Sequence, residues 1–143
     1  MKKGEIRKEI FEIEPKLRIW YKIKDFKKYL ERKSKYKLKF DPRIKKLKTY
    51  KGYKIFIVNG RLIRDKLDID FVMGGNGLHY LYVPMDEIWI DEIYYKTKEI
   101  DAIIIHEYTE FKAMRRGICY EKAHDIASFK ELIERRKNAP AEH

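Results

Sequence analysis

The amino-acid sequence predicts an α+β fold: an antiparallel sheet of about four or five strands, packed by a C-terminal helical hairpin and preceded by a basic helical arm. Three observations predict it. The length of 143 residues suits one domain with a short appendage. Short apolar runs separated by turn residues fill the chain from residue 53 to residue 91. Two longer segments with helix-end signals follow, over about residues 97–116 and 120–137.

The N-terminal third is basic and is predicted to be largely helical. Apolar residues interleave with charges over residues 3–14, which predicts a helix that ends before Pro15. A strand is expected over Leu17–Ile23, and a second helix after Asp25, which suits an N-cap. Residues 33–51 are basic, contain a Pro, and predict a loop. We therefore divide the chain into a basic helical arm, residues 1–50, and an α+β domain, residues 51–143.

The middle of the chain is expected to form the sheet. Tyr53–Val58 and Arg61–Arg64 flank Asn59-Gly60, a pair that suits the two-residue turn of a β-hairpin because both residues tolerate positive φ. Further strands are expected over residues 69–73, 78–83 and 87–91, with a turn over residues 74–77. This glycine-rich turn does not match a phosphate-binding loop, because no Lys-Ser/Thr pair follows it.

The last third predicts two helices joined by a short turn. Gly117 suits the position just after the end of the first helix. Arg115 and Arg116 complement the dipole in its last turn. The two helices are therefore expected to run antiparallel, side by side.

The composition excludes several classes of protein. No apolar run approaches the roughly 18 residues needed to span a bilayer, and the first residues lack the apolar core of a signal peptide. The single cysteine, Cys119, excludes an internal disulfide and a thiolate-rich metal site. We expect a cytoplasmic protein without a membrane partner.

Charge is distributed unevenly along the chain. Residues 1–66 contain 24 Lys and Arg against 8 Asp and Glu, whereas residues 67–143 contain 10 against 15. The chain has no Gln and three Asn, a composition typical of hyperthermophile proteins with ion-rich surfaces. The basic half therefore indicates a heat-adapted surface or, alternatively, a face that binds nucleic acid.

Three ionisable residues of the first C-terminal helix share one face. On a helical wheel, His106, Glu107 and Glu110 lie in the same sector as the apolar Ile103 and Met114. Burying carboxylates without a partner costs several kcal/mol, so a positive partner is expected. A divalent cation would serve that purpose.

The spacing of these residues suits a metal site. His106 and Glu110 are four residues apart on one helix, so both can reach a single ion, and His124 on the next helix can supply a third ligand. Two imidazoles and one carboxylate, with a fourth position left for water, are the ligand set of a catalytic zinc site. Glu107 would then lie beside the ion and accept a proton from its water.

This segment resembles the zincin metallopeptidases, in particular the gluzincin branch, in which a His-Glu-x-x-His helix is followed by a Glu ligand on a second helix. His106 matches the first ligand and Glu107 the general base, whereas Glu110 and His124 exchange the other two ligand types. The resemblance covers roughly residues 87–135 and implies a zinc-dependent, peptidase-like hydrolase. The whole chain is also similar to small uncharacterised archaeal and phage-borne proteins.

Several alternatives stay open. His106 and Glu110 could instead pair with each other while Lys or Arg neutralises Glu107, and the chain could be a non-enzymatic nucleic-acid-binding module or hold a purely structural metal. His79 and Tyr120 are candidates for binding an unidentified substrate, such as a peptide, although both also suit the core. The remaining minor candidates are Cys119 as a fourth ligand, Glu121 with His124 in a di-metal site, and Asp68 and Asp70 as turn caps or substrate ligands.

Overall fold

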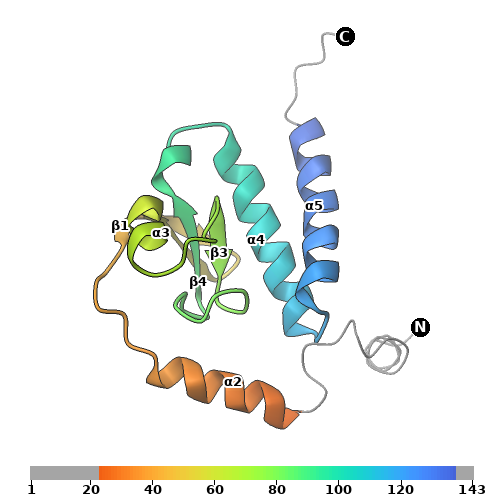
Figure 1. Cartoon of the computed structure of the whole chain (residues 1–143). Helices are drawn as coiled ribbons and strands as arrows, with labels where there is room; N and C mark the ends of the chain where they lie inside the picture. The colour runs from red at the N-terminus through yellow and green to blue at the C-terminus, as the bar shows by residue number, and fades with distance from the viewer. Residues whose placement is uncertain (1–22, 138–143) are drawn as a thin grey trace, which may run out of the picture.

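The computed structural model describes residues 23–137 (Figure 1). The predicted helix over residues 3–14 lies outside the described residues, as does the predicted strand over residues 17–23 except for Ile23, which begins a helix. The elements in chain order are α2 (Ile23–Lys35), β1 (Arg43–Tyr50), β2 (Tyr53–Val58), α3 (Gly60–Lys66), β3 (Gly74–Asn76), β4 (Glu87–Asp91), the 3-10 helix η2 (Glu92–Tyr94), α4 (Glu99–Arg115) and α5 (Tyr120–Lys137).

The fold is α+β, as predicted, with a four-stranded sheet in the order β1-β2-β4-β3. The sheet is mixed rather than wholly antiparallel: β1 with β2 and β3 with β4 are antiparallel pairs, but β2 and β4 run parallel. The parallel pair arises because the chain leaves β2 through α3 and a loop, returns as β3 at the far edge of the sheet, and then turns back as β4 between β3 and β2.

The hairpin at the edge of the sheet lies one element earlier than predicted. The basic segment expected to be a loop contains β1, which turns into β2 through Lys51 and Gly52, both at positive φ (48° and 90°). Nearly all of β1 is exposed, so it lacks the alternation of buried and polar residues that predicts a strand. The division predicted at residue 50 falls in this hairpin, and Arg43–Tyr50 is part of the sheet rather than of the arm.

The predicted turn at Asn59-Gly60 is wrong, because these residues begin α3. The side-chain oxygen of Asn59 accepts a hydrogen bond from the backbone N–H of Leu62 (2.9 Å), which is an N-cap. Gly60 leaves no room for a Cβ, because the Asp91 carboxylate lies against it and is held by Arg64 (2.8 Å). A tertiary contact therefore selects the helix over the turn.

The predicted strands over residues 69–73 and 78–83 are loops, and the predicted glycine turn is strand β3 instead. A Cβ on Gly74 would lie 2.7 Å from the backbone oxygen of Trp89 in the neighbouring strand. Glycine thus lets β3 approach β4 closely. The apolar residues on either side of β3, including Phe71, Tyr80 and Val83, are buried from the loops.

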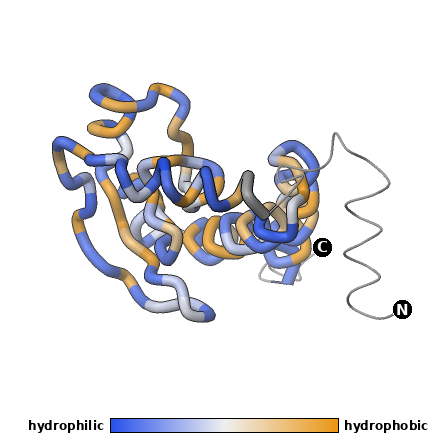
Figure 2. Tube along the Cα trace, turned by 90° about the horizontal axis from the view of Figure 1, so that it is seen from below, coloured by the Kyte–Doolittle hydropathy of each residue, from blue (hydrophilic) through white to orange (hydrophobic). Residues whose placement is uncertain are grey.

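The core lies on both faces of the sheet. On one face, isoleucines of β2 and β4 pack against Ile103 and Ile104 of α4. On the other face, Trp89 packs with Ile63, Phe71 and the tyrosines of the loop after β3. Hydrophobic and hydrophilic stretches alternate along the trace, as expected when each element buries one side (Figure 2).

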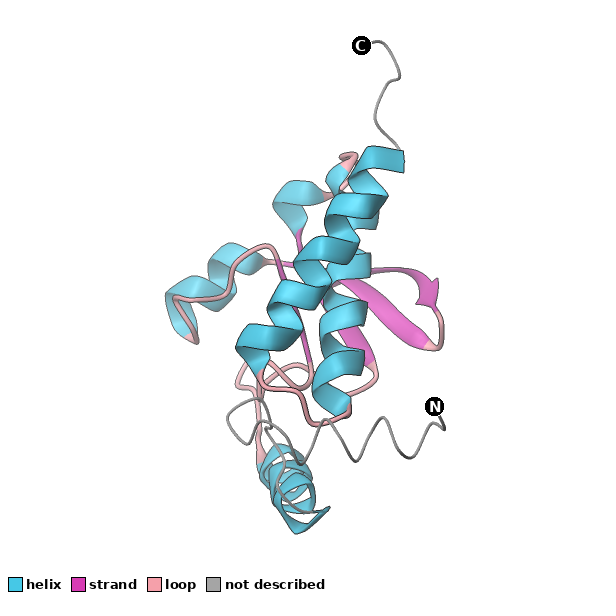
Figure 3. Cartoon of the chain, turned by 90° about the vertical axis from the view of Figure 1, so that its right-hand side faces the viewer, coloured by secondary structure: helices cyan, strands magenta, loops and turns pink. Residues whose placement is uncertain are grey.

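The C-terminal helical hairpin is confirmed, and it packs on the sheet through α4. The helix α4 lies between the sheet and α5 (Figures 1 and 3). Gly117, at a φ of 97°, ends α4 as predicted. Ala123 and Ala127 of α5 are completely buried, so the two helix backbones approach closely.

The helix α2 is fastened to the loop that follows β3. The hydroxyl of Tyr29 donates to the backbone oxygen of Gly77 (2.6 Å), and the Lys33 ammonium donates to the backbone oxygens of Tyr80 and Leu81. Among residues 23–137, no helix is long and apolar enough to cross a bilayer.

We predict that Gly74→Ala lowers the free energy of unfolding by about 1–3 kcal/mol, because the added methyl group forces β3 away from β4. Urea denaturation of the metal-free protein measures this change. Thr49→Ala on the exposed strand β1 is the control and should change little. An unchanged urea midpoint for Gly74→Ala would contradict the prediction, because it would mean that the close approach of β3 to β4 does not contribute to stability.

Candidate functional site

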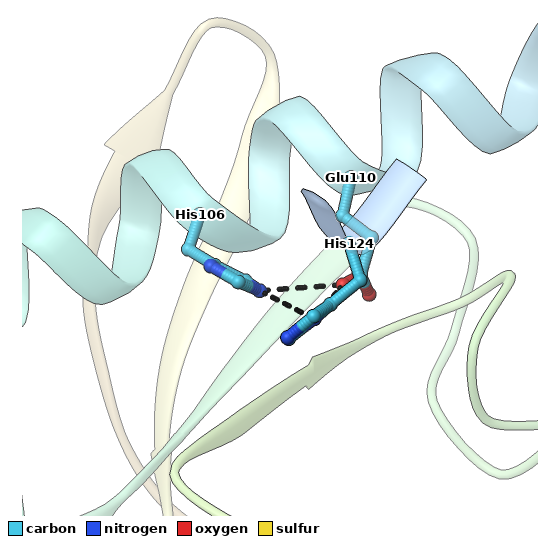
Figure 4. Close-up of side chains that lie close together, drawn as sticks. All are labelled: His106, Glu110 and His124. Carbon is cyan, nitrogen blue, oxygen red and sulfur yellow. Dashed lines mark hydrogen bonds and ion pairs between the residues drawn. The ribbon is translucent and has the colours of Figure 1, made fainter. Parts of the chain in front are cut away.

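Three side chains from the helical hairpin converge on one point (Figure 4). The Nε2 atom of His106 lies 3.3 Å from Oε2 of Glu110 and 3.2 Å from Nδ1 of His124. The third side of this triangle, from His124 Nδ1 to Glu110 Oε2, measures 3.1 Å. The three predicted ligands are therefore brought together, and this group could hold a metal ion.

The size of the triangle fits a tetrahedral metal site. Ligands about 2.0–2.2 Å from a tetrahedral ion are separated from one another by about 3.3–3.6 Å, which follows from the geometry of a tetrahedron. The observed separations of 3.1–3.3 Å come close to that range without any change of backbone. Only a small outward movement of the side chains would be needed to admit an ion.

Helix geometry and packing position these ligands. His106 and Glu110 lie one turn apart on the buried face of α4, as the wheel predicts. His124 reaches them because it lies between Ala123 and Ala127, whose small side chains bring α5 close to α4. The Glu110 side chain is only 1% exposed, whereas that of His124 is 45% exposed, so the site opens to solvent on the His124 side.

A second set of residues orients the His106 imidazole. The Nδ1 atom of His106 lies 2.9 Å from Oε1 of Glu131, so that Nε2 is turned toward the centre. The other oxygen of Glu131 accepts from Arg135 (2.7 Å), which also pairs with Glu99 at the start of α4. A carboxylate on the outer nitrogen of a ligating imidazole is a frequent feature of zinc sites.

Asn76 of β3 holds the two buried carboxylates. Its side-chain amide donates to Oε1 of Glu107 and to Oε1 of Glu110, both at 3.0 Å. Its oxygen accepts from the backbone N–H groups of Leu78 and His79. Every hydrogen-bonding position of Asn76 is therefore used, and its side chain is fixed.

No basic side chain neutralises these acids within the part of the chain that the structure describes. Among residues 23–137, Glu110 forms ion pairs only with histidines, and Glu107 forms none. The alternative in which Lys or Arg satisfies Glu107 is therefore wrong for residues 23–137. A cation or protons must offset the buried charge.

Electrostatics in the metal-free protein give the Glu107 and Glu110 carboxyl groups different pKa values. Burial and the neighbouring Glu110 raise the pKa of Glu107 to about 8. Burial also raises the pKa of Glu110, but hydrogen bonds with His106 and His124 outweigh it and leave that pKa below its ordinary value. For His106, burial lowers the pKa, and the bond to Glu110 and the nearby carboxylates more than reverse this. Protons are thus concentrated on Glu107 and His106.

The cluster forms one wall of a cavity of about 690 Å³. The loop before β3 contributes Asp68, Asp70 and Val72 to this cavity, and α5 contributes Ser128 and Glu131. Among residues 23–137, five carboxyl groups and three imidazoles line it, but no Lys or Arg does. The cavity is therefore acidic within a chain whose formal net charge is +11.

The predicted substrate-binding candidates also line this cavity. His79 lies in a loop rather than in a strand, stacked between the rings of Tyr80 and Tyr120 at centroid distances of 4.0 and 4.1 Å. Its Nδ1 atom is 3.7 Å from Oε1 of Glu110. The Tyr120 hydroxyl is 3.5 Å from Nδ1 of His124. Both residues therefore contact the metal-ligand group.

The structure places only some of the minor candidate residues at the site. Asp68 caps the turn, since it accepts from the backbone N–H of Asp70 (2.9 Å), and both residues also line the cavity. Cys119 and Glu121 are not part of the group of described residues that could hold a metal. Within residues 23–137, neither Cys119 nor Glu121 therefore joins His106, Glu110 and His124 in that group.

Two residues of the site were not predicted, namely Asn76 and Glu131. Asn76 lies among glycines for which the sequence predicts a turn, and nothing in that pattern predicts a buried side chain. Glu131 lies seven residues after His124, on the same side of α5 two turns later, and that spacing was a usable signal.

Comparison with protein-family models, curated proteins and solved structures finds no match for this chain. The resemblance to gluzincins therefore stays a prediction that rests on the motif residues.

We predict that the metal-free protein loses stability as the pH rises from about 5 to about 8. Glu107 holds a proton in the folded state that it releases in the unfolded state, and the raised pKa of His106 acts in the same direction. The loss is at most about 1.4 kcal/mol per pH unit for each proton. Urea denaturation in the presence of chelator measures it. Glu107→Gln should flatten this dependence, the exposed Glu121→Gln should not, and equal profiles for the two variants would contradict the prediction.

Proposed function

We propose that this protein is a small zinc-dependent hydrolase of peptide-like amide bonds, with His106, Glu110 and His124 as metal ligands and Glu107 as the general base. The observation that carries the proposal is the triangle of ligand atoms, 3.1–3.3 Å on each side, beside buried carboxylates that no described Lys or Arg neutralises. Such an arrangement is costly unless a cation occupies it.

The donor set favours zinc over other divalent ions. Two imidazole nitrogens and one carboxylate oxygen are typical zinc ligands, whereas magnesium and calcium prefer all-oxygen sites with more ligands. The hydrogen bond between Glu131 and the outer nitrogen of His106 supports the same choice.

The residues around the site suit hydrolysis. A zinc ion bound there would polarise the substrate carbonyl and lower the pKa of a water molecule toward about 7. Glu107 lines the same cavity and, with metal charge replacing its proton, would be a carboxylate able to accept the proton of the attacking water. Asn76 holds one Glu107 oxygen (3.0 Å), which leaves the other oxygen for that role.

Two cavity residues suit substrate positioning. The Tyr120 hydroxyl lies beside the ligand His124 and could donate to the oxyanion that forms on the substrate. The His79 ring is packed between two tyrosines, and burial lowers its pKa, which favours a neutral imidazole. A neutral imidazole can both donate and accept a hydrogen bond.

The cavity's charge favours an amide over a phosphate ester as substrate. Within the described part of the chain, five carboxyl groups and no Lys or Arg line the cavity, so a phosphodiester would be repelled from it. A neutral or positively charged peptide segment carries no such penalty. The free thiol of Cys119 fits a reducing, cytoplasmic setting, and the Lys-rich, Gln-free composition fits a heat-adapted, archaeal source.

We predict that the purified protein binds close to one zinc ion per chain. His106→Ala, Glu110→Ala and His124→Ala should each abolish stoichiometric binding, because a site with two remaining ligands holds zinc weakly. Elemental analysis and zinc titration measure this. His79→Ala is the matched control, since this cavity histidine is not in the triangle and its loss should leave zinc bound. Protein that stays metal-free after zinc addition would sink the proposal.

We predict that Glu107→Gln keeps the zinc and lowers hydrolysis of a fluorogenic peptide library by roughly 10²–10⁴-fold, because only proton transfer is lost. Glu131→Gln is the control for a change in carboxylate charge near the site, and it should act mainly through weaker zinc binding. If zinc raises the melting temperature but no peptide is cleaved by any form, the metal is structural rather than catalytic.

A further inference from the structure

We propose that the β1–β2 hairpin is a sequence-independent binding surface for double-stranded DNA, a function separate from the proposed hydrolase. The hairpin and the residues that lead into it, numbers 37–54, contain eight Lys and Arg against one Asp. Such a concentration of positive charge on one element is the electrostatic footprint of a protein that binds phosphates.

Most of this charge is not neutralised by the rest of the structure. Arg43, Lys48 and Lys54 form ion pairs with carboxylates. The remaining five basic residues form no ion pair with any carboxylate of residues 23–137, and all five are exposed: Lys37, Lys39, Lys45, Lys46 and Lys51. Lys45 instead donates to the Tyr95 hydroxyl, and Lys51 lies over the rings of Tyr50 and Tyr108, so both keep their charge available.

The lysines of β1 lie on both faces of the sheet edge. Lys45 and Lys48 lie opposite Ile57 and Ile55, on the face of the sheet that packs against α4. Lys46 lies opposite Phe56, on the other face. The hairpin extends outward from the helices, and β1 is the edge of the sheet (Figure 3). Because β2 is paired with β4 along nearly its whole length, the hairpin is not a free ribbon, and the exposed edge strand β1 and the turn are the parts that could lie along the phosphates of a duplex.

The side chains of the hairpin surface favour duplex over single-stranded nucleic acid. Stacking of single-stranded bases needs exposed aromatic faces. Here Tyr50, Tyr53 and Tyr108 are half-buried and pack edge-on against one another, at centroid distances of 5.3 and 5.7 Å. Phosphate contact therefore remains the main source of affinity.

The residue types on this surface also predict binding that does not depend on the DNA sequence. Base edges are read mainly by Arg, Asn and Gln, whose planar groups form paired hydrogen bonds. The chain has no Gln, and Arg43 is held by Asp41 and Glu87. Lysine supplies charge without that directional recognition.

The surface lies away from the candidate metal centre. The ligands are on α4 and α5, and none of the hairpin residues lines the acidic cavity. DNA bound at the hairpin therefore need not enter the cavity, which repels phosphates. Binding should be unaffected by chelation or by Glu107→Gln, so a failure of the hydrolase proposal would not remove it.

Fluorescence anisotropy of the full chain with a short labelled duplex, over a range of salt concentrations, tests the proposal. The triple variant Lys45→Gln, Lys46→Gln, Lys51→Gln should bind at least about tenfold more weakly at low salt, and the slope of log affinity against log salt should fall by about 2 to 3. The matched control, Lys122→Gln, Lys130→Gln, Lys137→Gln on the exposed side of α5, changes the net charge equally and should leave that slope nearly unchanged.

Three outcomes would overturn the proposal. They are equal losses in both triple variants, a salt response near zero in the unmodified protein, and equal or tighter binding of single-stranded DNA or of poly-glutamate. Thermal melting of both variants checks that each is folded. A single charge reversal, Lys46→Glu, provides a second test, because it leaves the contacts of Lys45 and Lys51 with tyrosines intact and should still weaken duplex binding.

Discussion

Two carboxylates one turn apart on the buried face of α4 are the constraint on which the rest of the site depends. Neither Glu107 nor Glu110 forms an ion pair with a Lys or Arg of residues 23–137, although the whole chain contains 34 Lys and Arg residues. Their charge is balanced instead by one amide, from Asn76, and by imidazoles on two helices. Asn76 reaches them only because β3 lies close against β4 at its glycines, and His124 only because Ala123 and Ala127 bring α5 against α4. Small residues that are distant in the sequence thus allow the close packing that positions this one cluster of charges.

Local signals predicted the helical part of this arrangement, while the sheet required information that no local window contains. The end of α4 at Gly117 and the four-residue spacing of His106 and Glu110 are visible within a few turns of sequence. By contrast, Asn59-Gly60 suits both a hairpin turn and a helix N-cap, and the carboxylate of the distant Asp91 decides between them. The strand β1 was missed for a different reason. An exposed edge strand rich in lysine is protected from aggregation by its charge and shows no apolar alternation.

The molecule separates its acidic and basic groups in space. Acidic groups gather in the cavity between the helical hairpin and the loop before β3, and basic groups gather on β1 and its turn. The two regions would repel each other's ligands: a polyanion is kept from the cavity and a cationic peptide from the hairpin. A chain of formal charge +11 can therefore contain a site for cations, because a local cluster dominates the field within about 10 Å at ordinary salt.

Protons and a metal ion would compete for the same cluster, and this competition would link folding to the proposed chemistry. Without an ion, the structure places a proton on Glu107, whose pKa is raised to about 8, and favours a second on His106. A bound divalent cation would displace both, because ligating imidazoles must present a lone pair and positive charge nearby favours the carboxylate. The general base proposed for the reaction would then be formed by metal binding itself. The burial that makes the metal-free cluster costly to ionise is thus also what would make its affinity for a cation depend steeply on pH.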